Sequence, residues 1–241
     1  MLQNLEEVSA LKIRIKFAKT GSMKFIGHLD VMRYFQKVMR RADVDIMYSE
    51  GFSPHQKMSF AAPLGVGLTS LGEYFDIDVH SSDSSEEMLR ILNETMVEGI
   101  EVLSYRLLPE DTKNAMSIVA AADYKVCFRE KYKPDIDVSK KFAEFMAGEK
   151  IEILKATKKS EMLVDIKPMI LDYKCLEDGI FLKLATGSES NLKPELVMSA
   201  FYDFLGLELG NFDIMSERLE IYGKSADDKL MPLEDFGQDI I

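Results

Sequence analysis

Two histidines in the first quarter of the chain are the residues best suited to acid–base chemistry. His28 lies in the sequence GHLD, and His55 lies in the sequence GFSPH. An imidazole gains or loses a proton near neutral pH, so a pair of histidines could serve as general acid and general base. A histidine at the start of a helix could equally be structural, because it can hydrogen-bond exposed backbone amides, or it could bind a substrate or partner. These three roles stay open.

Other types of chemical site have weaker support. His28, Asp30 and His55 are potential metal ligands, but they come from two distant loops and lack a fixed ligand spacing such as HExxH. The two cysteines, Cys127 and Cys175, form no CxxC motif, so they predict neither a disulfide framework nor a metal site. The glycines at 65, 67 and 72 do not match GxGxxG, which argues against a dinucleotide site. We therefore expect no metal and no cofactor.

Positive charge is concentrated around the two histidines. A predicted helix over residues 29–42 carries Arg33, Lys37, Arg40 and Arg41 on one side, a spacing that could follow a phosphate backbone. An ordinary solvated helix face is an equally good interpretation. The candidate residues for binding RNA or a partner are Lys19, Lys24, His28, Asp30, Arg33, Lys37, Arg40, Arg41, Ser53 and His55.

The charge distribution makes this region an exception in the chain. The 241 residues carry a formal net charge of −11, which argues against a general nucleic-acid binder. Residues 10–60 contain six lysines and four arginines against four acids, a net charge of +6, so the remainder carries −17. A basic patch on an acidic protein acts over about 8 Å at physiological salt. Partner choice could still be set there.

The elements around the patch predict a split βαβ arrangement. Residues 11–17 alternate between apolar and basic side chains, as in a half-buried strand, and the helix over residues 29–42 follows. We expect a short strand at 45–49, an extended segment at 58–62, a strand at 73–79, a helix that begins at Asp83 as N-cap, and a strand at 100–107. This order is that of the ferredoxin-like fold. Its first and third strands are neighbours, so we expect the cations Lys12, Arg14 and Lys16 to face Tyr74, Asp76 and Asp78.

The second half predicts a similar order with an additional hairpin. We expect strands at 124–128, 151–157, 162–166, 170–176, 180–185 and 214–222, and helices at 138–146 and from Pro194 to about Gly206. The fold class predicted is α+β, with two ferredoxin-like domains at residues 1–110 and 115–225 and an acidic C-terminal tail at 226–241. The first residues lack the charge and apolar run of a signal peptide, so we expect a cytoplasmic protein that does not interact with membranes.

Several short motifs occur along the chain: KTG at residues 19–21, GHLD at 27–30, the pair Arg40 and Arg41, YSEGFSPH at 48–55, MSFAAPL at 58–64 and VDIKPMILD at 164–172. Together these segments resemble one bacterial family of unknown function, the radical SAM-linked proteins. Residues 56 and 57 are Gln and Lys, where members of the family often have Pro and Arg. The first half also resembles, more faintly, ferredoxin-like RNA-processing proteins of CRISPR systems.

The resemblance implies a context for the protein. Members of this family resemble companions of B12-binding radical SAM proteins, either fused to them or encoded beside them, and often near ribonuclease E/G genes. A radical SAM cluster needs three thiolates, and this chain has two cysteines. We therefore expect a non-catalytic RNA-binding or substrate-presenting partner of a radical SAM enzyme that acts on RNA or the translation machinery. The alternatives are an RNA-directed enzyme that uses His28 and His55, and a protein–protein adaptor.

Overall fold

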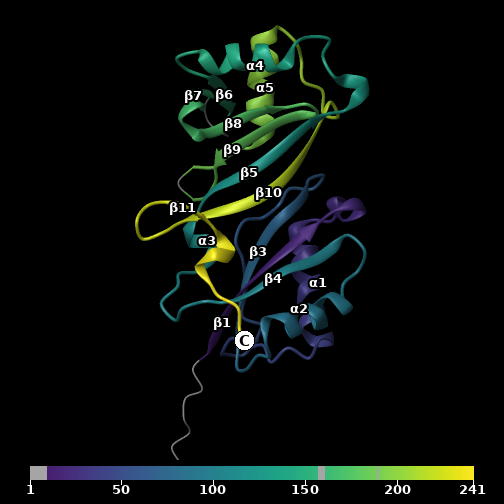
Figure 1. Cartoon of the computed structure of the whole chain (residues 1–241), viewed down its shortest axis with the longest axis vertical. Coiled ribbons are helices and arrows are strands. Elements are labelled where there is room, and N and C mark those ends of the chain that lie inside the picture. Colours follow the sequence, from purple (N-terminus) through teal and green to yellow (C-terminus); the bar gives the residue numbers. More distant parts are fainter. Residues whose placement is uncertain (1–9, 157–160, 189) are drawn as a thin grey trace, which may run out of the picture. The chain divides into compact units, whose positions relative to one another are not determined.

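Two stretches of sequence from opposite ends of the chain meet in the first of two units. The computed structural model describes residues 10–156, 161–188 and 190–241. Unit 1 comprises Met1–Val119 and Gly223–Ile241, and unit 2 comprises Ala120–Tyr222. Both units mix helices with strands, and every strand pair whose register is defined in them is antiparallel. The α+β class is therefore confirmed (Figure 1).

Unit 1 contains the strands and helices that the first half of the sequence predicts. The order of its sheet is β4-β1-β3-β2, so β1 and β3 are the central strands. Its elements are β1 (Leu11–Lys19), η1 (Gly21–Phe25), α1 (His28–Arg41), β2 (Met58–Phe60), β3 (Thr69–Val79), α2 (Ser85–Glu94), β4 (Ile100–Leu107) and α3 (Ala115–Ile118).

Helices α1 and α2 pack on one face of this sheet. The alternation of β1 directs Ile13, Ile15 and Phe17 to that face, where they meet the buried side of α1 and join one hydrophobic core. Phe17 and Phe35 lie with ring centroids 4.7 Å apart in an edge-to-face arrangement, which is favourable beyond the area buried. Because one side of α1 is buried in this core, its opposite side is exposed.

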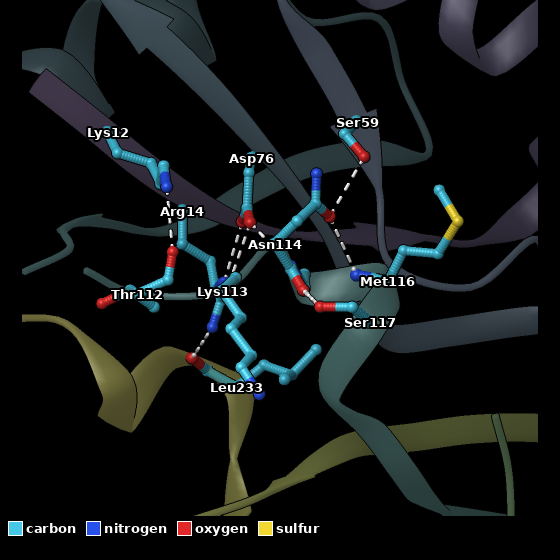
Figure 2. Close-up of polar contacts among 11 residues, drawn as sticks. Lys12, Arg14, Ser59, Asp76, Thr112, Lys113, Asn114, Met116, Ser117 and Leu233 are labelled. Atoms are coloured by element: carbon cyan, nitrogen blue, oxygen red, sulfur yellow. Dashed lines mark hydrogen bonds and ion pairs between the residues drawn. The ribbon is translucent and has the colours of Figure 1, made fainter. Parts of the chain in front are cut away.

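The opposite face of β1 carries a buried ion pair (Figure 2). Arg14 is fully buried and faces Asp76 in the register of β1 and β3; its Nε lies 2.8 Å from Asp76 Oδ1, and its Nη2 lies 3.0 Å from Oδ2. Arg14 Nη1 also donates to the Leu233 carbonyl at 3.1 Å. This pair confirms the predicted cross-strand contact. The register also places Lys12 opposite Asp78 and Lys16 opposite Tyr74, as predicted, with Lys16 Nζ 5.6 Å from the centre of the Tyr74 ring. In addition, Lys12 donates to the Thr112 carbonyl, and Lys16 pairs with Glu234.

The C-terminal residues, predicted as a separate acidic tail, are folded into unit 1. They form β11 (Leu230–Pro232) and η4 (Leu233–Phe236), and Leu233 is fully buried. Gln238 then pairs with Leu107 of β4, and Ile240 exchanges hydrogen bonds with Ser85 at 2.9 Å each. Backbone pairing and one buried leucine hold this segment, although its composition is acidic.

A second correction concerns α2, whose N-cap is Ser84 and not Asp83, because Ser84 Oγ accepts the Glu87 N–H.

Unit 2 contains a second four-stranded order and a separate pair of strands. Its strand order is β10-β5-β9-β8, and β6 and β7 pair with each other in a two-stranded sheet outside this order. Its elements are β5 (Val119–Phe128), η2 (Glu130–Tyr132), α4 (Val138–Ala147), β6 (Glu152–Ala156), β7 (Glu161–Asp165), η3 (Lys167–Met169), β8 (Ile170–Leu176), β9 (Gly179–Ala185), α5 (Pro194–Leu205) and β10 (Ile214–Lys224). The predicted strand end at residue 157 lies outside the described residues.

No helix in the described part of the chain is both long enough and apolar enough to cross a membrane.

Candidate functional site

The cations of α1 form an exposed stripe. Val31, Phe35, Val38 and Met39 are buried against the sheet, which leaves the opposite side of the helix in solvent. Arg33, Lys37, Arg40 and Arg41 are all exposed there. Arg33 lies 3.4 Å from Asp30 at an exposed position, while Lys37, Arg40 and Arg41 form no ion pair or hydrogen bond with the residues that the structure describes. Three cations are therefore available to an anionic partner.

A short hairpin after α1 carries His55. The Lys57 N–H donates to the Met47 carbonyl and the Ser49 N–H to the His55 carbonyl, both at 2.8 Å. Gly51 has φ 104°, a left-handed conformation that a side chain would strain, so the chain can reverse there. Ser49 Oγ lies 2.8 Å from His55 Nδ1 and accepts the His55 backbone N–H at 3.1 Å, which orients the imidazole.

The tip of this hairpin exposes an aromatic ring. Phe52 is fully exposed, and Ser53 and His55 beside it are exposed as well. An exposed phenylalanine gains nothing from the core of unit 1, so its ring is free to contact a partner. Phe52 is not among the residues predicted from the sequence to bind RNA or a partner. The signal that could have identified it is an aromatic residue between Gly51 and the pair Ser53 and Pro54. These neighbours indicate an exposed loop, which does not bring the ring back to the core.

The hairpin is attached to α1. Gln56 is buried, and its Nε2 donates to the Gln36 carbonyl of α1 at 3.3 Å and to Tyr48 Oη at 3.4 Å. Tyr48 and Arg40 line the same surface hollow. The structure thus brings the hairpin beside the cationic stripe. We call this region the α1–hairpin surface, and it comprises Arg33, Lys37, Arg40, Arg41, Tyr48, Phe52, Ser53 and His55.

His28 belongs to a different environment. It lies against the ring of Phe60, with centroids 5.2 Å apart, in a pocket of about 10 Å³ that Lys19 and Glu73 also line. Such a space holds about one water molecule. Burial lowers the pKa of His28, the Glu73 carboxylate opposes this shift, and the Lys19 ammonium adds to it. The surroundings of His28 and His55 share no residue, so these contacts form no two-histidine site.

The remaining candidate residues are placed unequally. Lys19 is buried, and its Nζ donates to the Ile26 carbonyl at 3.1 Å, so its ammonium supports the loop before α1. Lys24 is half-buried, with its Nζ 5.2 Å from the centre of the exposed Phe25 ring. Asp30 is exposed and close to Arg33. Lys19 and Lys24 thus belong to β1 and η1, outside the α1–hairpin surface, whereas Asp30 lies on α1 beside Arg33.

Comparison with known proteins identifies the family of the chain. Residues 12–194 match the family described as "Uncharacterized protein conserved in bacteria (DUF2344)". The chain belongs to this family. The matched residues include the whole α1–hairpin surface and the pocket of His28. No curated protein matches the sequence. Membership in this uncharacterized family assigns no activity to the chain.

Proposed function

We propose that this DUF2344 protein is a non-catalytic RNA-binding protein and that the α1–hairpin surface is its RNA contact. The observation that carries the proposal is that α1 exposes three unpaired cations and that the hairpin attached to this helix through Gln56 fully exposes Phe52. Cations along one helix face neutralise phosphates, and an exposed aromatic ring stacks on bases. The combination fits single-stranded RNA, whose bases are accessible.

The strand orders support a finer description of the fold. In unit 1 the order β4-β1-β3-β2, with α1 after β1 and α2 after β3, agrees with two interleaved split βαβ units. In unit 2 the order β10-β5-β9-β8 agrees with the same arrangement, with β6 and β7 as an insertion. We propose that both units are ferredoxin-like. In unit 1 the face of β1 that carries Arg14 is occupied by the C-terminal segment, which directs the RNA proposal to α1 and the hairpin instead.

The partnership with a radical SAM enzyme is part of the same proposal and rests on the resemblance of the sequence motifs. In this arrangement the DUF2344 chain holds the RNA, and the B12-binding radical SAM protein performs the reaction. The alternative, in which His28 and His55 catalyse a reaction on RNA, has less support because the described contacts of the two histidines share no residue.

The decisive experiment replaces the unpaired cations and measures binding of a mixed-sequence single-stranded RNA as a function of salt. Lys37→Ala combined with Arg41→Ala should weaken binding across sequences and lower the slope of log K against log salt by roughly 0.7 for each lost contact. Phe52→Ala should weaken binding by about 1–3 kcal/mol and leave that slope unchanged, because stacking releases no counterions.

A matched control removes the same charge elsewhere. Lys131→Ala with Lys133→Ala takes two exposed lysines from unit 2 and should change neither affinity nor slope. Equal RNA binding by the α1 variant and this control would refute the proposal. If the α1 variant instead loses an acidic protein partner while RNA binding is unaffected, the surface is a protein–protein adaptor.

A further inference from the structure

A hollow lies where the C-terminal end of α1 meets the base of the hairpin. Its volume is about 470 Å³, within the roughly 300–1,000 Å³ of pockets that hold small ligands. The lining combines an apolar part, one cation, two carboxylates and one aromatic ring: Met39, Val44, Ile46, Arg40, Asp43, Asp45 and Tyr48. Because Arg40 and Tyr48 also belong to the α1–hairpin surface, a strand of RNA on that surface would pass the mouth of this hollow.

Asp43 occupies a backbone position that favours glycine. α1 ends in a Schellman motif, in which the Val44 N–H donates to the Met39 carbonyl at 3.0 Å and Asp43 has φ 51°. α5 ends in the same motif, where the left-handed residue is Gly206 with φ 69°. A side chain in this conformation costs roughly 1–2 kcal/mol relative to glycine. α1 therefore carries a carboxylate at a position where glycine would be less strained.

The carboxylate of Asp43 is also available. It is exposed and forms no hydrogen bond or ion pair with the part of the chain that the structure describes. Asp45 is more constrained, because its Oδ2 accepts a hydrogen bond from Ser81 Oγ at 2.8 Å. Tyr48 is about half exposed, and the hydrogen bond from buried Gln56 holds its ring at the edge of the hollow.

These groups match the chemistry of guanine. A carboxylate only accepts hydrogen bonds. Guanine presents two adjacent donors, N1–H and the 2-amino group, which one carboxylate can accept together; adenine, cytosine and uracil each present a single donor group on that edge. The Tyr48 ring offers a stacking surface, and an arginine such as Arg40 can donate to guanine O6 and N7. Two aspartates against one arginine disfavour a phosphate in the hollow, so the phosphates remain with Lys37 and Arg41.

We propose that this hollow is a specificity pocket for a single unstacked guanine of the bound RNA, with Asp43 as the acceptor for its Watson–Crick edge. The inference rests on the proposed function and names the base that the RNA site prefers. Asp43 reads the base, Tyr48 stacks on it, and the cations of α1 hold the backbone on either side.

The test compares single-stranded RNAs that differ at one base. The probes are oligouridylates that carry one guanosine, one inosine or one adenosine, and inosine lacks only the 2-amino group. The wild type should bind the guanosine RNA about 10-fold or more tightly than the inosine RNA, because a hydrogen bond to a charged acceptor is worth about 1.5–3 kcal/mol. Asp43→Asn, which tolerates the left-handed conformation, should lose this preference and keep the salt dependence of binding. Asp43→Gly should do the same while relieving the strain.

The control is the other aspartate with a positive φ. Asp228 has φ 60° and lies in the C-terminal segment, so Asp228→Asn removes one charge from an equivalent backbone conformation and should leave the preference intact. If the Asp43→Asn protein still prefers guanosine, or if the wild type never does, the pocket assignment fails while RNA binding by α1 stands.

A second measurement separates the pocket from the proposed function. Should no RNA bind, the proposed function fails, and titration of the protein with GMP and IMP then decides on the pocket alone. Tighter binding of GMP than of IMP, lost in Asp43→Asn, would support the pocket. Equal binding of the two nucleotides by the wild type would overturn it.

Discussion

Arg14 is a buried cation whose charge is matched by Asp76 (Figure 2). Removal of one member of a buried pair leaves the other charge uncompensated, which typically costs about 3–5 kcal/mol. Asp76→Asn should therefore lower the free energy of unfolding of unit 1 by about that amount, measured by urea denaturation. The carboxylate also accepts the Ala115 N–H at 2.8 Å, so the variant should disturb the segment before α3 as well.

Asp78 supplies the matched control on the same strand. It lies 3.8 Å from Lys57, and both side chains are partly exposed. Asp78→Asn should cost less than about 1 kcal/mol, because exposed pairs contribute little. Similar losses in the two variants would contradict the assignment of Arg14 and Asp76 as the pair that stabilises unit 1.

His28 should make the stability of the protein depend on pH. Burial lowers its pKa in the folded state, with Lys19 adding to the shift and Glu73 opposing it, so the unfolded chain binds the proton at a higher pH than the folded chain. The free energy of unfolding is then highest above about pH 6.5 and falls as the pH drops below it through the folded-state pKa. In His28→Gln this contribution disappears, and thermal unfolding from about pH 7 to about pH 5 should show a shallower loss than in the wild type.

The control for His28→Gln is the same substitution at a histidine on the surface, and it should leave the pH dependence of unfolding as in the wild type. His55→Gln removes a histidine from the exposed hairpin loop without changing the pocket of Phe60. A wild-type slope in His28→Gln would mean that other groups set the pH dependence.

At the scale of elements, periodicity predicted most of unit 1 and unit 2. The helix expected at 29–42 is α1 at His28–Arg41, and the strand expected at 100–107 is β4 at Ile100–Leu107. Both have a strong period because one side packs on a core. The segment expected as a strand at 45–49 is held by single bridges at Ile46 and Tyr48, since its partners are a loop residue and the end of β3.

Other features depend on contacts that no local pattern carries. Lys19 follows an alternating strand and looks like a surface cation, yet the Ile26 carbonyl and its neighbours around His28 enclose it. The tight turn between β8 and β9 is formed by Glu177 and Asp178, and Gly179 is the first residue of β9, paired with Leu176. A Cβ there would stand 2.2 Å from the Val126 carbonyl oxygen, so the glycine permits close approach of β5.

At the scale of the whole molecule, the C-terminal segment is the part least accessible to sequence reasoning. Its contacts join residues more than two hundred positions apart, such as Arg14 with Leu233 and Lys16 with Glu234. Its acidic residues indicate a solvated tail when read locally. The pairing of Gln238 with the edge strand β4 instead blocks an edge that would be open to association.

The last prediction uses this segment to test the division into two units. Deletion of residues 226–241 removes β11 and η4, leaves Arg14 Nη1 without the Leu233 carbonyl, and exposes the edge of β4. By hydrogen exchange, the amides of β1, β3 and β4 should lose protection, whereas those of β5 and β9 in unit 2 should retain it.

A milder variant keeps this prediction testable if the deletion prevents folding. Leu233 is fully buried, so Leu233→Ala should lower the free energy of unfolding of unit 1 by about 2–5 kcal/mol, while Leu230→Ala, at an exposed position of the same segment, should have little effect. Protection would then fall in β1, β3 and β4 first, because the described contacts of Leu233 lie in unit 1. Equal loss of protection in both units would mean that the chain unfolds as one cooperative body, with the C-terminal segment stabilising all of it.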